Sequence, residues 1–146
     1  MKKYLIFLSL MFLVSCNFAP GSYPYAEIYT IEVGYNNLIQ AVEEFKRTHP
    51  EYIVPDSVGL YDGKSDRPDD HWYHIYFYNK TQNKILYTWV RTSDEGCSFA
   101  FVAVNDGLKL GNWKYINKDF SSKENRLEKQ YFETEILNYI RQSLYN

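Results

Sequence analysis

Two short aromatic runs in the middle of the chain restrict its fold more than any other feature. His71 to Tyr78 (HWYHIYFY) and Ile85 to Arg91 (ILYTWVR) are rich in aromatic and β-branched residues, and the polar residues 79–84 separate them. Runs of this length and composition, joined by a short polar connection, are typical of β-hairpins. The pattern predicts two antiparallel strands around which a small domain is built.

Apolar residues at helical spacing predict a helix before the hairpin, over residues 36–49. Its apolar positions follow the spacing i, i+3, i+4 and i+7: Leu38, Ala41, Val42 and Phe45. Asn36 or Asn37 is suited to cap the start, and Pro50 ends the helix. One face of this helix is expected to pack on the sheet.

The remaining segments extend the hairpin into an α+β domain. Further strands are expected at residues 27–33, 53–61 (interrupted near Pro55), 98–104 and 113–116, with a charged loop at 62–70. Ser121 and Glu124 form a capping box that starts a C-terminal helix. Residues 34–146 are therefore predicted to form a single two-layer domain, with an N-terminal helix, an antiparallel sheet of three to five strands and a C-terminal helix.

The first 15 residues have the form of an export signal. Lys2 and Lys3 precede 11 mostly apolar residues, Tyr4 to Val14. A membrane-spanning helix needs about 20 apolar residues, so this run is too short to be an ordinary anchor. A charged start followed by a short apolar run describes a secretory signal peptide, here residues 1–15.

The end of this leader resembles the lipobox of bacterial lipoproteins, in which an apolar and a small residue precede a cysteine. The residues that carry the resemblance are Leu13, Val14, Ser15 and Cys16. It implies that Cys16 is lipidated, with fatty acyl chains such as palmitate, and that residues 16–33 tether the domain to the membrane. Asn17 after the cysteine resembles outer-membrane sorting, which places the domain in the periplasm.

The net charge limits the kinds of partner that the domain can bind, and the cysteine count limits its disulfides. Removing the leader with its two lysines leaves 131 residues and changes the net charge from −2 to −4. A mildly acidic domain offers no basic surface for nucleic acid, so its membrane contact is expected to come from the lipid. With Cys16 lipidated, Cys97 has no disulfide partner, and we expect its thiol to be buried.

No motif in the chain predicts catalysis, a metal or a cofactor. The histidines are His49, His71 and His74, and the last two point to opposite faces of a strand. The acidic loop does not follow the spacing of a calcium-binding EF-hand. We therefore predict a binding protein rather than an enzyme, with a lone catalytic thiol at Cys97 or a small hydrolase as alternatives.

Residue pairing in the hairpin predicts a candidate binding surface. A tight turn at Thr81 and Gln82 places one set of side chains together on a single sheet face: Trp72, His74, Tyr76, Tyr87, Trp89 and Arg91. Trp, Tyr and Arg are the residue types enriched in binding hot spots. One alternative is that a loop, another strand or the N-terminal stretch covers this face. Another is that its tyrosines are simply exposed on the sheet without a binding role. A shift in register would exchange the two faces.

The sequence thus favours a lipid-anchored periplasmic protein that binds a protein partner through this face. One such partner would be a delivered toxin, with the chain as its immunity protein. The alternatives are a structural lipoprotein of an envelope or secretion assembly, and a small periplasmic hydrolase or carbohydrate binder.

Overall fold

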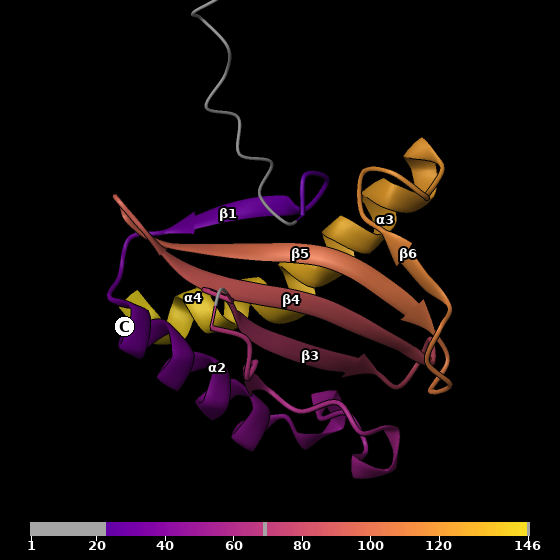
Figure 1. The fold of residues 1–146 in the computed structure, drawn as a ribbon, viewed down its shortest axis with the longest axis horizontal. Coiled ribbons are helices and arrows are strands. Elements are labelled where there is room, and N and C mark those ends of the chain that lie inside the picture. The colour runs from indigo at the N-terminus through magenta and orange to yellow at the C-terminus, as the bar shows by residue number, and fades with distance from the viewer. Residues whose placement is uncertain (1–22, 69, 146) are drawn as a thin grey trace, which may run out of the picture.

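A computed structural model of the chain describes residues 23–68 and 70–145, which form an antiparallel sheet with helices against it (Figure 1). The strand order is β1–β5–β4–β3–β2, and β6 also pairs with β5. The strands are β1 (Glu27–Ile31), β2 (Gly63–Lys64), β3 (Tyr73–Asn79), β4 (Lys84–Ser93), β5 (Gly96–Asp106) and β6 (Trp113–Tyr115). The predicted α+β architecture is confirmed.

The hairpin of β3 and β4 has the predicted register. Tyr78 pairs with Ile85, and the ladder continues through Tyr76 with Tyr87 and His74 with Trp89. Because side chains alternate along a strand, this register also decides which residues face the helices. Ile75, Phe77 and Leu86 lie on the helix side and are completely buried.

Two strands share one edge of β5. β1 pairs with residues 97–101, and β6 pairs with residues 103–105. β1 forms within the edge strand expected at residues 27–33, and it falls inside the range 16–33 that was predicted as a tether. The packed part of the chain therefore extends back before residue 34.

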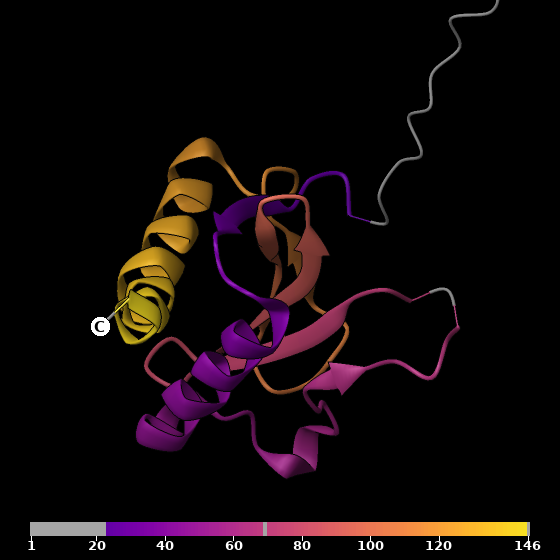
Figure 2. The ribbon, with the colours of Figure 1, turned by 90° about the vertical axis from the view of Figure 1, so that its left-hand side faces the viewer.

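All the long helices lie on the same side of the sheet (Figure 2). They are α2 (Tyr35–Thr48) and a C-terminal helical run of α3 (Ser122–Phe132), the π-helical turn η4 (Glu133–Leu137) and α4 (Asn138–Tyr145). In Figure 2 both groups stand to the left of the sheet, while the segment that leads into β3 stands to its right. In the part of the chain that the structure describes, the other sheet face is therefore left without a helix.

The first of these helices buries the predicted apolar stripe. Its buried residues are Leu38, Ala41, Val42 and Phe45. The helix begins one residue earlier than expected, after Gly34, and no side chain caps it. Asn36 and Asn37 consequently lie within its first turn, so the predicted cap is wrong.

The C-terminal helical run begins at the predicted capping box. The Ser121 side chain accepts from the Glu124 N–H, and the Glu124 side chain accepts from the Ser121 N–H. Phe132, at the end of α3, is completely buried, with its ring centroid 4.9 Å from that of Phe101 and 5.6 Å from that of Phe99. This ring joins the helices to the centre of the sheet.

The connection between α2 and β3 differs from the prediction. The 3₁₀ turn η3 (Asp56–Val58) lies where a strand was expected at residues 53–61, and a second 3₁₀ turn, η2 (Pro50–Tyr52), directly precedes this range. Pro50 and Pro55 lack the N–H that a strand would offer to its neighbours, which favours turns here. The expected strand was wrong for this reason.

The short strand β2 forms inside the segment that was expected to be a charged loop. Asp62 holds this segment to β3, because one of its carboxylate oxygens accepts from the Tyr76 N–H at 2.9 Å. The other oxygen accepts from the Lys46 ammonium at 2.5 Å, and that ammonium also donates to the Tyr76 carbonyl. Burial lowers the pKa of Lys46, while Asp62 opposes that shift.

Cys97 lies in β5 and is completely buried, as expected. Its thiol donates to the Val33 carbonyl, with 3.4 Å between the two atoms. Burial raises the pKa of Cys97, which keeps the thiol protonated and unreactive. The alternative of a catalytic thiol at this position has no structural support.

Candidate functional site

The sheet face without a helix carries the six residues predicted as a binding surface, and we call it the aromatic face. Its residues are Trp72, His74, Tyr76, Tyr87, Trp89 and Arg91. Five of them belong to β3 and β4, the sixth, Trp72, directly precedes β3, and they occupy alternate positions along each strand. Alternation therefore gathers them opposite the helix layer.

Ring contacts bring these residues into one cluster. The Trp72 and Trp89 ring centroids are 4.1 Å apart, and the Tyr76 and Tyr87 rings stack at 5.0 Å. The His74 ring stacks on Tyr87 at 5.7 Å, and Tyr87 packs in the same cluster as Trp72 and Trp89.

The cluster has a buried layer and an accessible layer. Trp89 is only 2% exposed, whereas Trp72, His74, Tyr76 and Tyr87 are partly buried. Trp89 therefore supports the face from beneath and is not itself available to a partner. Its indole N–H is buried and has no hydrogen-bond partner among the residues that the structure describes.

Arg91 marks the exposed end of the face. Its guanidinium carbon lies 4.6 Å from the Trp72 ring centroid and 5.5 Å from that of Trp89. A guanidinium over an indole gains cation–π attraction and keeps its N–H donors free at the edges. Trp72 and Arg91 thus form an accessible aromatic and cationic pair.

The N-terminal stretch covers part of the aromatic face, which was one of the alternatives left open by the sequence. The Tyr23 ring centroid lies 6.0 Å from that of Trp72, 5.8 Å from that of Tyr87 and 6.1 Å from that of Trp89. A turn in which the Ala26 N–H donates to the Tyr23 carbonyl then leads into β1. We call residues 23–26 the strap.

The last tryptophan also belongs to this side of the molecule. Trp113 in β6 has its ring 5.9 Å from that of Tyr87 and packs against the same cluster as Trp72 and Trp89. The chain has three tryptophans in total. All of them therefore lie on the sheet face that no helix covers.

A chain of hydrogen bonds links the strap to the loop before β3. The Asp70 carboxylate lies 2.7 Å from Nε2 of His74, and Nδ1 of His74 lies 2.5 Å from the Tyr87 hydroxyl. The Tyr87 hydroxyl in turn lies 2.8 Å from the Tyr23 hydroxyl. With a neutral imidazole, Asp70 accepts from Nε2, so that Tyr87 donates to Nδ1 and Tyr23 donates to Tyr87.

Asp70 supplies the negative charge at one end of this row of hydrogen bonds. Its carboxylate accepts hydrogen bonds from the Ser65 hydroxyl, from the Trp72 N–H and from His74. Burial raises the pKa of Asp70, but these hydrogen bonds outweigh burial and lower it to about 2. The carboxylate is therefore ionised at neutral pH and orients the imidazole.

The order carboxylate, imidazole, hydroxyl is the one that nucleophilic hydrolases use, so its chemistry has to be considered. Here the hydroxyl belongs to Tyr87, and burial raises its pKa far above the ordinary range of a phenol. Burial also raises the pKa of Tyr76 to about 12. The Tyr87 hydroxyl is held between His74 and Tyr23, so we assign this hydrogen-bond network a structural role: it positions these side chains and holds the strap.

A second surface borders the strap where it enters β1. A cavity of about 250 Å³ is lined by strap residues together with Val102, Tyr115 and Lys118. Tyr25 is 48% exposed and Tyr115 is 41% exposed, and the Lys118 ammonium lies 5.3 Å and 5.5 Å from their respective ring centroids. The accessible aromatic surface therefore continues from the hairpin to the edge of the sheet.

Sequence reasoning missed three residues of this region. Tyr23 and Trp113 come from segments whose strand partners the sequence does not specify, although both carry an aromatic ring. Asp70 was assigned to a solvated acidic loop. Its position four residues before His74 was the available signal, because a turn before the strand can bring the two together.

Among the described residues, no three His, Cys, Asp or Glu side chains gather as metal ligands would. The helices in the part of the chain that the structure describes are all too short or too polar to cross a membrane. Cys16 lies outside the described residues. Comparison with protein-family models, with curated proteins and with solved structures finds no match to this chain.

Proposed function

We propose that the chain is a lipid-anchored binding protein of a bacterial cell envelope, attached to the outer membrane through Cys16 and facing the periplasm. The charged start, the short apolar run and the lipobox-like ending of residues 1–16 support the anchor. A lipidated cysteine that carries two or more acyl chains holds a protein stably at a bilayer, whereas one chain holds it only marginally.

The short connection to the anchor keeps the aromatic face near the membrane. Seven positions separate Cys16 from Tyr23, whose ring packs on the aromatic face. At about 3.5 Å per residue, even a fully extended connection reaches only about 25 Å. A partner that binds this face would therefore be held close to the bilayer surface.

We infer that the aromatic face holds a protein partner. The observation that carries this inference is the position of all three tryptophans on the sheet face without a helix. Trp, Tyr and Arg dominate binding hot spots because they offer large rigid contact areas with polar tips. Trp72 and Arg91 are the accessible pair, and Trp89 supports them from below.

An immunity protein against a delivered toxin is the form of this function that we favour. A mature chain of 131 residues with a net charge of −4 suits a small inhibitor that acts outside the cytosol. The alternatives are a structural lipoprotein of an envelope or secretion assembly and a carbohydrate binder, since Trp72 would also stack on a sugar ring. The remaining alternative is a small periplasmic hydrolase, although the Tyr87 hydroxyl next to His74 is already engaged by Tyr23.

Metabolic labelling tests the anchor. Cells that express the chain are grown with labelled palmitate, and the wild type is compared with Cys16→Ala. We expect label and membrane association in the wild type and loss of both in the variant. An unlabelled wild-type chain that keeps residues 1–15 in the soluble fraction would contradict the anchor.

Partner capture tests the aromatic face. The full chain is used to recover proteins from envelope extract of the bacterium that produces it, and the wild type is compared with the double variant Trp72→Ala, Arg91→Ala. Losing two hot-spot residues should reduce recovery of a specific partner at least about tenfold. Circular dichroism verifies that both chains are folded.

The matched control removes one exposed aromatic residue and one exposed arginine from the helix side of the molecule, in Tyr145→Ala, Arg126→Ala. This control should recover the partner as the wild type does. Equal recovery by the wild type, the double variant and the control would refute the proposal that the aromatic face binds the partner. Retention by the wild type of cell-wall polysaccharide in place of protein would favour the carbohydrate alternative.

A further inference from the structure

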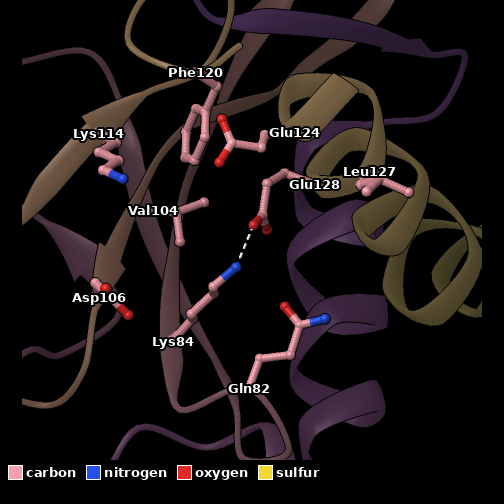
Figure 3. A pocket seen from close by; sticks show the side chains of 9 residues that line it. All are labelled: Gln82, Lys84, Val104, Asp106, Lys114, Phe120, Glu124, Leu127 and Glu128. Carbon is pink, nitrogen blue, oxygen red and sulfur yellow. Dashed lines mark hydrogen bonds and ion pairs between the residues drawn. The ribbon is translucent and has the colours of Figure 1, made fainter. Parts of the chain in front are cut away.

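A polar pocket opens on the opposite side of the sheet from the aromatic face. It has a volume of about 400 Å³ and lies between α3 and the strand ends of β4, β5 and β6 (Figure 3). Pockets that hold small molecules have volumes of about 300–1,000 Å³. Its size therefore suits a small ligand and not a macromolecule.

Two lysines enter this pocket from the sheet. Lys84 pairs with Asp106 across β4 and β5, and Lys114 pairs with Val104 across β5 and β6. Val104 and Asp106 are two positions apart on β5 and therefore lie on the same face. The register thus places two ammonium groups and one carboxylate on the sheet wall of the pocket.

Two glutamates face them from the helix. Glu124 and Glu128 are four positions apart on α3, so they lie one turn apart on the same helix face. The capping box holds Glu124 in place, because its carboxylate accepts from both the N–H and the hydroxyl of Ser121. The helix wall is consequently anionic, and it stands opposite the two lysines (Figure 3).

One ion pair, between Lys84 and Glu128, spans the pocket from the sheet wall to the helix wall. The Lys84 ammonium donates to one oxygen of Glu128, whose side chain is only 9% exposed. The other Glu128 oxygen accepts no hydrogen bond from any described residue. Removing two charges from water offsets most of the energy of such a pair, so stability alone gives little reason to bury it.

The other two charged groups on the sheet wall, Lys114 and Asp106, are not paired in this way with any described residue. The Lys114 ammonium lies 5.6 Å from the Phe120 ring centroid and points toward the pocket (Figure 3). Within the described part of the chain it forms no ion pair, and neither does Asp106. Phe120 and Leu127 add apolar surface at the rim, and Leu127 is 51% exposed.

We propose that this pocket binds a small zwitterion, an amino acid with an apolar side chain. The ligand carboxylate would pair with the ammonium of Lys114, and the ligand ammonium with the free oxygen of Glu128. Its side chain would then lie against Phe120 and Leu127. A ligand of one charge sign would meet like charges on one of the two walls, whereas a zwitterion satisfies both.

Ligand-observed NMR on the purified full chain tests the site with phenylalanine and with 6-aminohexanoate, a zwitterion with more widely spaced charges. The controls 3-phenylpropionate and phenethylamine each lack one charge. We expect saturation transfer to phenylalanine and not to the controls. Transfer to 6-aminohexanoate alone would overturn the assignment to an amino acid with an apolar side chain. No transfer to either zwitterion at about 10 mM, well above a Kd of about 1 mM, would overturn the proposal, as would equal transfer to a control.

Paired lysine variants locate the site. Lys114→Met removes one ammonium from the pocket, and Lys123→Met makes the same change at an exposed position of α3 outside it. Loss of a charge-assisted contact should weaken binding about tenfold in Lys114→Met and leave Lys123→Met unchanged. Equal affinity in both variants would refute the site. The result is independent of the aromatic face, which lies across the sheet.

Discussion

The hydroxyl groups of Tyr23 and Tyr87 lie 2.8 Å apart, although 64 positions separate the two residues in the sequence. This contact fastens the strap to the middle of the sheet and covers Trp89. The strap is also the described segment closest to Cys16 in the sequence. The strap, which begins seven positions after the proposed anchor at Cys16, is therefore held on the proposed binding surface.

Opening the strap should expose the buried tryptophan. Tyr23→Ala removes the ring that contacts Trp72, Tyr87 and Trp89, so acrylamide should quench tryptophan fluorescence more strongly than in the wild type. Tyr23→Phe keeps the ring and loses only the hydroxyl, at a cost of about 1 kcal/mol in the free energy of unfolding. Its quenching should remain close to that of the wild type. Identical quenching of the Ala variant would mean that the strap does not shield Trp89.

The carboxylate of Asp70 should make stability depend on pH in the acidic range. Its folded-state pKa is lowered to about 2 from an ordinary value of 3.8, so its contribution is fully present above pH 3.8. That contribution is lost as the pH falls through about 2. The midpoint of thermal unfolding of Asp70→Asn should lie below that of the wild type at pH 6, and the gap should close by about pH 2.

Hydrogen bonding or charge also lowers the pKa of Glu27 and Glu124, so these groups contribute to the pH dependence of stability too. The difference between the wild type and Asp70→Asn separates the contribution of Asp70 from theirs. Asp94→Asn, at an exposed position in the turn between β4 and β5, serves as the control and should show no gap. A gap between Asp70→Asn and the wild type that stayed constant from pH 6 to pH 2 would show that ionisation of Asp70 is not responsible.

Phe132 should be among the most costly positions to truncate. Its ring is completely buried and contacts Phe99 and Phe101 in the sheet. Phe132→Ala should lower the free energy of unfolding by about 3–5 kcal/mol, because it removes apolar contacts and leaves a cavity. Leu127→Ala on the same helix, at a half-exposed position, should cost about 0.5 kcal/mol or less. Urea titrations of both variants check the contrast, and similar losses would be inconsistent with this packing.

Gly96 should not tolerate a side chain. Its φ is +121°, and an added Cβ would lie 2.5 Å from the Ile31 carbonyl oxygen, where β1 meets β5. Gly96→Ala should therefore cost about 2 kcal/mol or more. Gly59→Ala is the control, since its φ is also positive but nothing lies within 4 Å of the added atom. If both variants unfolded at the same urea concentration, backbone strain alone would account for the loss at Gly96.

Local patterns in the sequence were sufficient for the hairpin and the helices. The pairing of Tyr76 with Tyr87 follows from the turn between the two strands, and the stripe from Leu38 to Phe45 follows from helical spacing. The expected strand at residues 53–61 was wrong because Pro55 favours a 3₁₀ turn there. These features depend on residues close together in the sequence, so they can be read without a structure.

The candidate site was predictable only in part. Alternation along β3 and β4 placed Trp72, His74 and Trp89 on one face, but it did not reveal that Trp89 is buried. That burial depends on Tyr23, which comes from a segment far away in the sequence. The lipid at Cys16 remains a prediction from the leader, outside the described residues.

The sequence by itself determined the secondary structure of the hairpin, the register of its strands and the set of side chains on each sheet face, because side-chain alternation has a period of two residues. Only the tertiary structure decided that the strap lies over the aromatic face and that Lys84 and Lys114 oppose Glu124 and Glu128 across a pocket. Such contacts depend on how distant segments pack against each other, and no local spacing in the chain encodes that packing.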